Sequence, residues 1–124
     1  MIAVRILANL THVDKENRFE GLFDRYYALL NDSVIVAGHL AACSGTISKA
    51  KPELRSNITQ QLLNIDKIMQ KHKDLVKAYV IDAFYEYFRE AENKSEILQF
   101  VRGQLNSRSP KTRKKAKQFL RTWR

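Results

Sequence analysis

The sequence of 124 residues has few of the residues that make tight turns, cross-links or membrane spans. Only two prolines and four glycines occur, which disfavours sandwiches and barrels because those folds need a turn every few residues. The single cysteine, Cys43, cannot form an internal disulfide, so nothing in the composition requires an oxidising compartment. The most apolar run, residues 34–43, is well short of the ~20 residues of a spanning helix. We therefore expect a cytoplasmic protein with no membrane span.

Apolar side chains are plentiful and regularly spaced. Hydrophobic residues make up 44% of the chain, enough for one packed core, and the length suits a single domain over residues 1–124. Their three- and four-residue spacing is typical of amphipathic helices. The sequence thus predicts an all-α fold with seven helices. These helices cover residues 2–10, 16–30, 34–47, 52–69, 75–91, 95–105 and 110–123.

Local features refine these helices. The segment 34–47 is apolar nearly all round, which predicts a buried helix, and its small residues Gly38 and Gly45 would let a neighbouring helix approach closely. Short polar side chains favour helix starts because they accept bonds from free amides. On this ground we expect Asp74, Ser95 and Ser109 to cap the helices that follow them.

Four segments of the chain align with one another. The alignment is anchored on Val4, Val34, Leu75 and Thr112, which are separated by 30, 41 and 37 residues. Another helix lies between successive anchors, so each repeated unit is a helix pair. Periods of roughly 30 to 47 residues with two helices each indicate an α-solenoid.

Residues 109–116 (SPKTRKKA) resemble the start of the second helix in HEAT and armadillo repeats, where a polar-Pro-x-[β-branched]-Arg-x-x-Ala pattern recurs. Residues 4–8 are similar, whereas Ile35 and Val76 stand where the arginine would be. The whole chain also looks like small prokaryotic HEAT-like proteins of no assigned activity. The resemblance implies an α-α superhelix of about three and a half HEAT-like helix pairs, with an incomplete first repeat at residues 1–12. It also implies a right-handed superhelix with a concave binding surface, used mainly for scaffolding and occasionally adapted for nucleic acid.

The first predicted helix lacks the polar outer face that terminal repeats normally carry. Only Arg5 and Asn9 oppose its apolar residues, which are Ile2, Val4, Ile6, Leu7 and Leu10. We therefore expect either self-association through this helix or a longer solenoid of which the chain is a piece.

The sequence carries no catalytic constellation. The glycines are scattered, so no phosphate-binding loop occurs. His39 and Cys43 stand four residues apart, but a histidine and a cysteine on a buried helix are more typical of packing than of metal binding. Asp82 falls beside Glu86 on a solvated face without a tryptophan cluster, which disfavours base excision. We expect no enzymatic activity, cofactor or metal.

Positive charge is concentrated in the second half. Residues 1–62 hold seven basic and six acidic side chains, whereas residues 63–124 hold fifteen and seven. With the apolar stripe of the last helix buried, five cations fall within about a third of its circumference. These candidate contacts for an anion or a partner are Arg113, Lys114, Lys117, Arg121 and Arg124.

Two functions fit this sequence. The basic last helix also has a third interpretation, in which its charges are simply hydrated and bind no ligand. The first function, which the repeats favour, is a non-enzymatic scaffold or adaptor that binds a protein partner or copies of itself. The alternative is a nucleic-acid-binding module that uses the basic C-terminal helix. A continuous basic track leading to that helix would favour nucleic acid, and interruption by carboxylates would favour protein. The track would contain Lys67, Lys71, Lys73 and Lys77, and the interrupting residues would be Glu86, Glu90 and Glu92.

Overall fold

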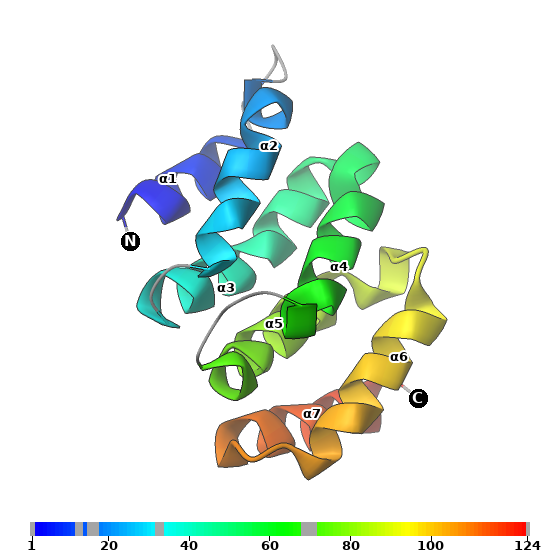
Figure 1. Ribbon diagram of the computed structural model, residues 1–124. Coiled ribbons are helices and arrows are strands. Elements are labelled where there is room, and N and C mark those ends of the chain that lie inside the picture. The colour runs from blue at the N-terminus through cyan, green and yellow to red at the C-terminus, as the bar shows by residue number, and fades with distance from the viewer. Residues whose placement is uncertain (1, 12–13, 15–17, 32–33, 68–71, 124) are drawn as a thin grey trace.

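The computed structural model describes residues 2–11, 14, 18–31, 34–67 and 72–123 of the chain, and these form α-helices and no strands (Figure 1). This confirms the prediction of an all-α fold with seven helices for the described residues. The helices are α1 (Ile2–Leu10), α2 (Arg18–Ala28), α3 (Val34–Ala50), α4 (Arg55–Leu63), α5 (Lys73–Tyr87), α6 (Lys94–Gly103) and α7 (Pro110–Thr122).

The helices form two layers. In the first layer α1, α3, α5 and α7 lie side by side in that order, and each packs against the next (Figure 1). The helices α2, α4 and α6 form the second layer. Helix α2, for example, bridges two helices of the first layer. The hydroxyl of Tyr26 in α2 donates to the carbonyl of Val4 in α1 at 3.1 Å, and Tyr27 shares a hydrogen bond of 2.9 Å with Ser44 in α3.

The central helix α3 packs most extensively against α5. Its small residues permit this approach, because a Cβ atom on Gly38 would lie 3.1 Å from the ring of Tyr79. Likewise, a Cβ atom on Gly45 would lie 2.5 Å from the carboxylate of Glu86. The expectation of a buried helix with a small-residue face is confirmed.

Aromatic rings fill the core between α5, α6 and α7. Phe119 of α7 is completely buried, and its ring meets the ring of Phe88 edge-on at a centroid distance of 5.3 Å. Phe84 of α5 contacts Phe100 of α6 in the same manner at 5.8 Å. The C-terminal helices are therefore fixed to α5 by large buried side chains.

A buried lysine holds the start of α2. Lys51, which is 4% exposed, places its ammonium 3.3 Å from the carboxylate of Asp14 and 3.4 Å from that of Glu20. Asp14 accepts hydrogen bonds from the backbone N–H groups of Phe19 and Arg18, at 2.8 and 2.9 Å, and so caps α2. These bonds, the Phe19 bond first, hold the pKa of Asp14 below its usual value.

The predicted cap at Ser109 is confirmed. Its side chain accepts a hydrogen bond of 3.3 Å from the N–H of Thr112, and Pro110 is the first residue of α7. The predicted segment 52–69 is broken up, because 3₁₀ turns at Pro52–Leu54 and Asn64–Lys67 flank α4. Its last two residues lie outside the described ones.

The predicted caps at Asp74 and Ser95 are wrong. Both residues lie inside the first turn of a helix, since α5 begins at Lys73 and α6 at Lys94. The N-cap positions belong to His72 and Asn93, whose carbonyls accept the first helical hydrogen bonds. A carboxylate in the first turn, as at Asp74, still favours the helix through its macrodipole.

None of the described helices combines the length and the apolar composition that crossing a lipid bilayer requires.

Candidate functional site

Two lysines of α7 face α5 and have partners there. The ammonium of Lys111 donates to the hydroxyl of Tyr79 at 3.0 Å and lies 4.3 Å from the centre of the ring. The ammonium of Lys115 lies 3.1 Å from the carboxylate of Asp82. These cations therefore bind α7 to α5 and are already engaged within the chain.

The five predicted contact residues do not form one continuous edge. Arg113 is half-buried, and its guanidinium donates to the carbonyl of Ser107 at 2.6 Å, which fastens the connection between α6 and α7. Arg124 lies outside the described residues. Three side chains are exposed and form no hydrogen bond or ion pair with any described residue. These three, the basic edge, are Lys114, Lys117 and Arg121.

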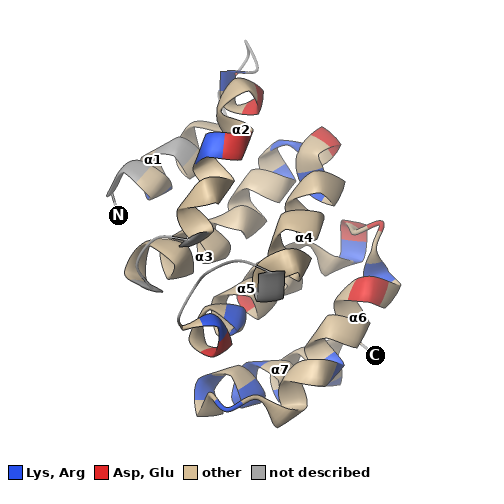
Figure 2. Cartoon of the chain, in the orientation of Figure 1, with Lys and Arg blue, Asp and Glu red and all other residues tan. Residues whose placement is uncertain are grey.

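The basic track expected for nucleic acid is interrupted where the structure describes it. Lys77 is buried, and its ammonium lies 4.0 Å from the carboxylate of Asp74. Lys71 and the side chain of Lys67 lie outside the described residues. Exposed carboxylates follow at the end of α5 and in its connection to α6, where Figure 2 shows acidic residues among basic ones. Of the four residues of the track, the structure thus describes the side chains of Lys73 and Lys77 alone.

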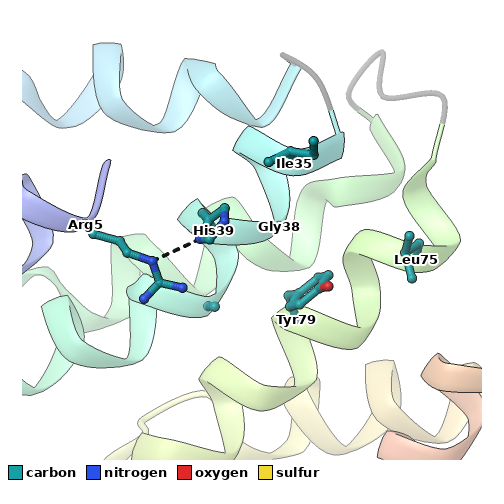
Figure 3. A pocket seen from close by; sticks show the side chains of 7 residues that line it. Arg5, Ile35, Gly38, His39, Leu75 and Tyr79 are labelled. Atoms are coloured by element: carbon teal, nitrogen blue, oxygen red, sulfur yellow. Dashed lines mark hydrogen bonds between the residues drawn. The ribbon is translucent and has the colours of Figure 1, made fainter. Parts of the chain in front are cut away.

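A hollow of about 270 Å³ opens on the first layer, between α1, α3 and α5 (Figure 3). Its apolar walls are open to solvent, since 62% of Ile35 and 37% of Leu75 are exposed. None of the described residues that line it carries a carboxylate. The residues of this α1–α3–α5 hollow are Arg5, Ile35, Gly38, His39, Ala42, Leu75 and Tyr79.

The polar groups of this hollow are mainly hydrogen-bond donors. The Nε atom of Arg5 donates to Nδ1 of His39 at 3.1 Å (Figure 3), which leaves both terminal nitrogens of the guanidinium without a partner among the described residues. Because Nδ1 of His39 accepts, the neutral ring carries its proton on Nε2, which is a further donor. On the opposite wall the hydroxyl oxygen of Tyr79 accepts from Lys111. The described lining therefore combines an apolar surface with one cation, Arg5.

A second hollow of about 420 Å³ lies between α5 and α7. The ion pair between Asp82 and Lys115 lines it, and so does Arg121. Its aromatic wall includes Tyr85, which is 44% exposed and packs edge-on against Phe119 at 6.2 Å. This hollow offers a mixed surface of aromatic rings, one carboxylate and two cations.

Cys43 and His39 show no arrangement for catalysis or metal binding. Burial raises the pKa of the Cys43 thiol, although the positive charge of Arg5 opposes the effect, so the thiol stays neutral near pH 7. The Nδ1 atom of His39 is occupied by Arg5. Within the described ranges, no three His, Cys, Asp or Glu residues gather closely enough to hold a metal ion.

Comparisons of the chain with protein-family models, with curated proteins and with solved structures find no match. The resemblance to HEAT and armadillo repeats therefore stays a prediction, and the function has to be inferred from the geometry of the surface.

Sequence reasoning missed the α1–α3–α5 hollow, whose walls come from helices far apart in the chain. The repeat alignment did not point to it consistently: the aligned Arg5 and Ile35 both line the hollow, but Val76, aligned with them, is buried.

Proposed function

We propose that this protein is a non-enzymatic scaffold that binds a protein partner on the open face of the α1, α3, α5 and α7 layer. The observation that carries the proposal is the α1–α3–α5 hollow, where Ile35 and Leu75 are exposed within a recess. Apolar side chains grouped in a recess with a polar rim are typical of interaction sites. The hollow would act as the anchor point of the interface.

The arrangement of the two hollows supports an interface that extends across several helices. Leu75, Tyr79 and Asp82 are spaced by four and three residues and so share one face of α5. The first two line one hollow and the third lines the other. A partner lying across this face would meet an apolar recess and then the ion pair of Asp82. Such a mixture is usual in protein interfaces.

The two-layer order of the helices also supports this function. Alternation of first-layer and second-layer helices along the chain is the order that stacked HEAT-like pairs produce. A solenoid of about three and a half such pairs, as proposed from the sequence, would present its first-layer helices as one continuous binding face. Scaffolds of this type need no catalytic group.

Site-specific cross-linking tests the proposal. A photo-reactive phenylalanine analogue placed at Ile35 should form an adduct with one protein in extracts of the source cells. The same analogue at Gln61, exposed on α4 in the other layer, is the matched control and should not. The purified partner should then bind the wild type, bind Gln61→Glu equally, and bind Ile35→Glu at least about tenfold more weakly, because a charge cannot enter an apolar recess without cost. Equal binding to both variants would contradict the proposal.

A second candidate function is nucleic-acid binding at the basic edge, which Lys114, Lys117 and Arg121 favour because they are free of partners within the described chain. Three phosphate contacts predict that log K falls against log salt with a slope of about −2.7. Reversal of the three charges to Glu should flatten this slope. Three reversals at exposed cations elsewhere, in Arg25, Lys49 and Lys94, provide the control. Absence of duplex binding at low salt would exclude this function.

A further inference from the structure

The chemistry of the α1–α3–α5 hollow identifies the kind of partner segment that fits it, an inference that rests on the proposed function. We propose that the hollow binds the C-terminal residue of a partner chain. The α-carboxylate would pair with Arg5, and an apolar side chain would pack between Ile35 and Leu75. The partner would thus be recognised by a free chain end with a large apolar last residue.

Charge complementarity indicates the carboxylate. The bond from Nε of Arg5 to His39 fixes the guanidinium and leaves its two terminal nitrogens, which form the edge that binds a carboxylate through two parallel hydrogen bonds. Arg5 is the cation that lines the hollow, and none of the described lining residues is acidic. The described lining therefore carries a positive charge that a carboxylate would neutralise.

The balance of donors and acceptors favours a chain end over a segment that passes through. The lining side chains supply donors, and the hydroxyl oxygen of Tyr79 already accepts a bond from Lys111. An internal peptide segment would bring N–H groups, for which the described lining side chains supply few acceptors. A carboxylate brings two acceptor oxygens and no N–H. The last residue of a chain therefore matches the donors better than a residue from its middle.

The size of the hollow sets how much of the partner it holds. Its volume of about 270 Å³ falls below the ~300–1,000 Å³ of typical sites for drug-sized ligands. Gly38 leaves space at the bottom of the hollow, because a Cβ atom there would lie 3.1 Å from the ring of Tyr79. The hollow thus suits one large apolar side chain and its carboxylate, and the rest of the partner would lie outside on the first-layer face.

Binding of three synthetic peptides tests the inference. The probes are acetyl-Gly-Ser-Gly-Ser-Leu with a free carboxylate, the same peptide with a C-terminal amide, and the free-acid peptide that ends in Ser. The free-acid Leu peptide should bind. The amide should bind at least about tenfold more weakly because it lacks the charged acceptor for Arg5. The Ser peptide should also bind at least about tenfold more weakly, because it lacks the apolar side chain. Isothermal titration measures the affinities.

Variants of the protein locate the effect. Arg5→Gln should weaken binding of the free-acid Leu peptide at least about tenfold. Arg5→Lys, which keeps the charge without the two-nitrogen edge, should give an intermediate affinity. Arg25→Gln removes the same group from an exposed position on α2 and should change nothing. Circular dichroism of each variant should match the wild type, and urea unfolding should confirm that any loss of affinity comes from the site.

The outcomes separate this inference from the proposed function. Equal affinity for the free acid and the amide would overturn recognition of the carboxylate. Tighter binding of octanoate than of the peptide would overturn the inference that the ligand is a protein chain end, and would indicate a small carboxylic acid instead. If the cross-linked partner still binds at Ile35 with full affinity after carboxypeptidase removes its last residue, the inference fails and the proposed function stands. Absence of both the cross-link and peptide binding would contradict the two together.

Discussion

The two edges of the first helical layer present opposite surfaces. At one edge, α1 exposes half of Ile6 and half of Leu10, which lie one helical turn apart. At the other edge, α7 exposes the basic edge of Lys114, Lys117 and Arg121. An outermost helix has one face with no neighbour, and α7 covers that face with charge, whereas α1 leaves apolar side chains on it. Part of the excess positive charge of the second half of the chain therefore lies on this exposed edge.

The two edges also differ in the described side chains that they bury. Phe119 of α7 is completely buried among other aromatic rings. Among the described side chains of α1, the buried ones are the smaller Val4 and Ala8, which are 4% and 1% exposed. We therefore expect Phe119 and Val4 to contribute unequally to stability.

Truncation of Phe119 in α7 and of Val4 in α1 should give the largest difference in stability between the two edges. Phe119→Ala should lower the free energy of unfolding by about 3–5 kcal/mol, because it removes a whole ring from the core. Val4→Ala removes two carbon atoms and should lower it by about 1–2 kcal/mol. Urea unfolding measures both values. Equal losses would show that α1 and α7 are anchored alike.

Alkaline pH provides a second test of the two halves. Burial raises the pKa of Tyr26 and Tyr27 in the N-terminal half and that of Tyr87, to about 12, in the C-terminal half. The fold thus favours the neutral hydroxyls, so their contribution is complete below pH 10 and is lost as the pH rises above it. Each tyrosine should lower the free energy of unfolding by about 1.4 kcal/mol per pH unit between pH 10 and 12.

Phenylalanine variants assign this loss. Replacement of both Tyr26 and Tyr27 by Phe should flatten the alkaline slope about twice as much as Tyr87→Phe, when unfolding is followed from pH 9 to 11.5. An unchanged slope in the double variant would mean that these hydroxyls ionise in the folded protein.

Glutamine substitutions compare the contributions of Arg113 and Lys117 of α7 to stability. Arg113→Gln should lower the free energy of unfolding by about 1 kcal/mol, because it removes the bond to the carbonyl of Ser107. Lys117→Gln at the basic edge should change it by less than about 0.5 kcal/mol. Thermal unfolding of the pair at equal salt is the measurement. A larger effect at Lys117 would show that the basic edge serves the fold.

Two exposed glycines offer the smallest effects. A Cβ atom at Gly21 in α2 or at Gly103 in α6 would have no neighbour within 4 Å. Each change to Ala should therefore raise the free energy of unfolding by about 0.5–1 kcal/mol, in both halves alike. Gly38→Ala is the contrasting variant, because its Cβ would crowd Tyr79, and it should gain less or lose stability. Equal gains in stability at all three positions would show that the ring of Tyr79 moves aside for the added Cβ atom at little cost.

The sequence predicted those features that depend on neighbouring residues along the chain. Helical spacing of apolar residues gave the all-α fold and the buried α3, and the pair Ser109 and Pro110 marked the start of α7. The contact between Lys51 and Asp14 was missed because the two residues lie 37 apart in the chain. Contacts of this kind arise only when the helices are packed together.

The candidate site was harder to predict for the same reason. On a helical wheel Arg113 and Lys117 share one edge and look equivalent. Only the position of the Ser107 carbonyl, set by the turn before α7, makes one of them structural. The α1–α3–α5 hollow likewise brings Arg5 beside His39, 34 residues away. Chemistry assembled from separate helices leaves little trace in local patterns of sequence.

The most direct test of the central claim is a map of backbone amide shifts in the ¹⁵N-labelled protein during titration with the free-acid Leu peptide. The account predicts that the amides of Gly38, His39 and Tyr79 shift in proportion to the bound fraction while those of Lys114 and Lys117 stay in place. Shifts confined to the basic edge of α7, with the amides around the hollow unmoved, would contradict it.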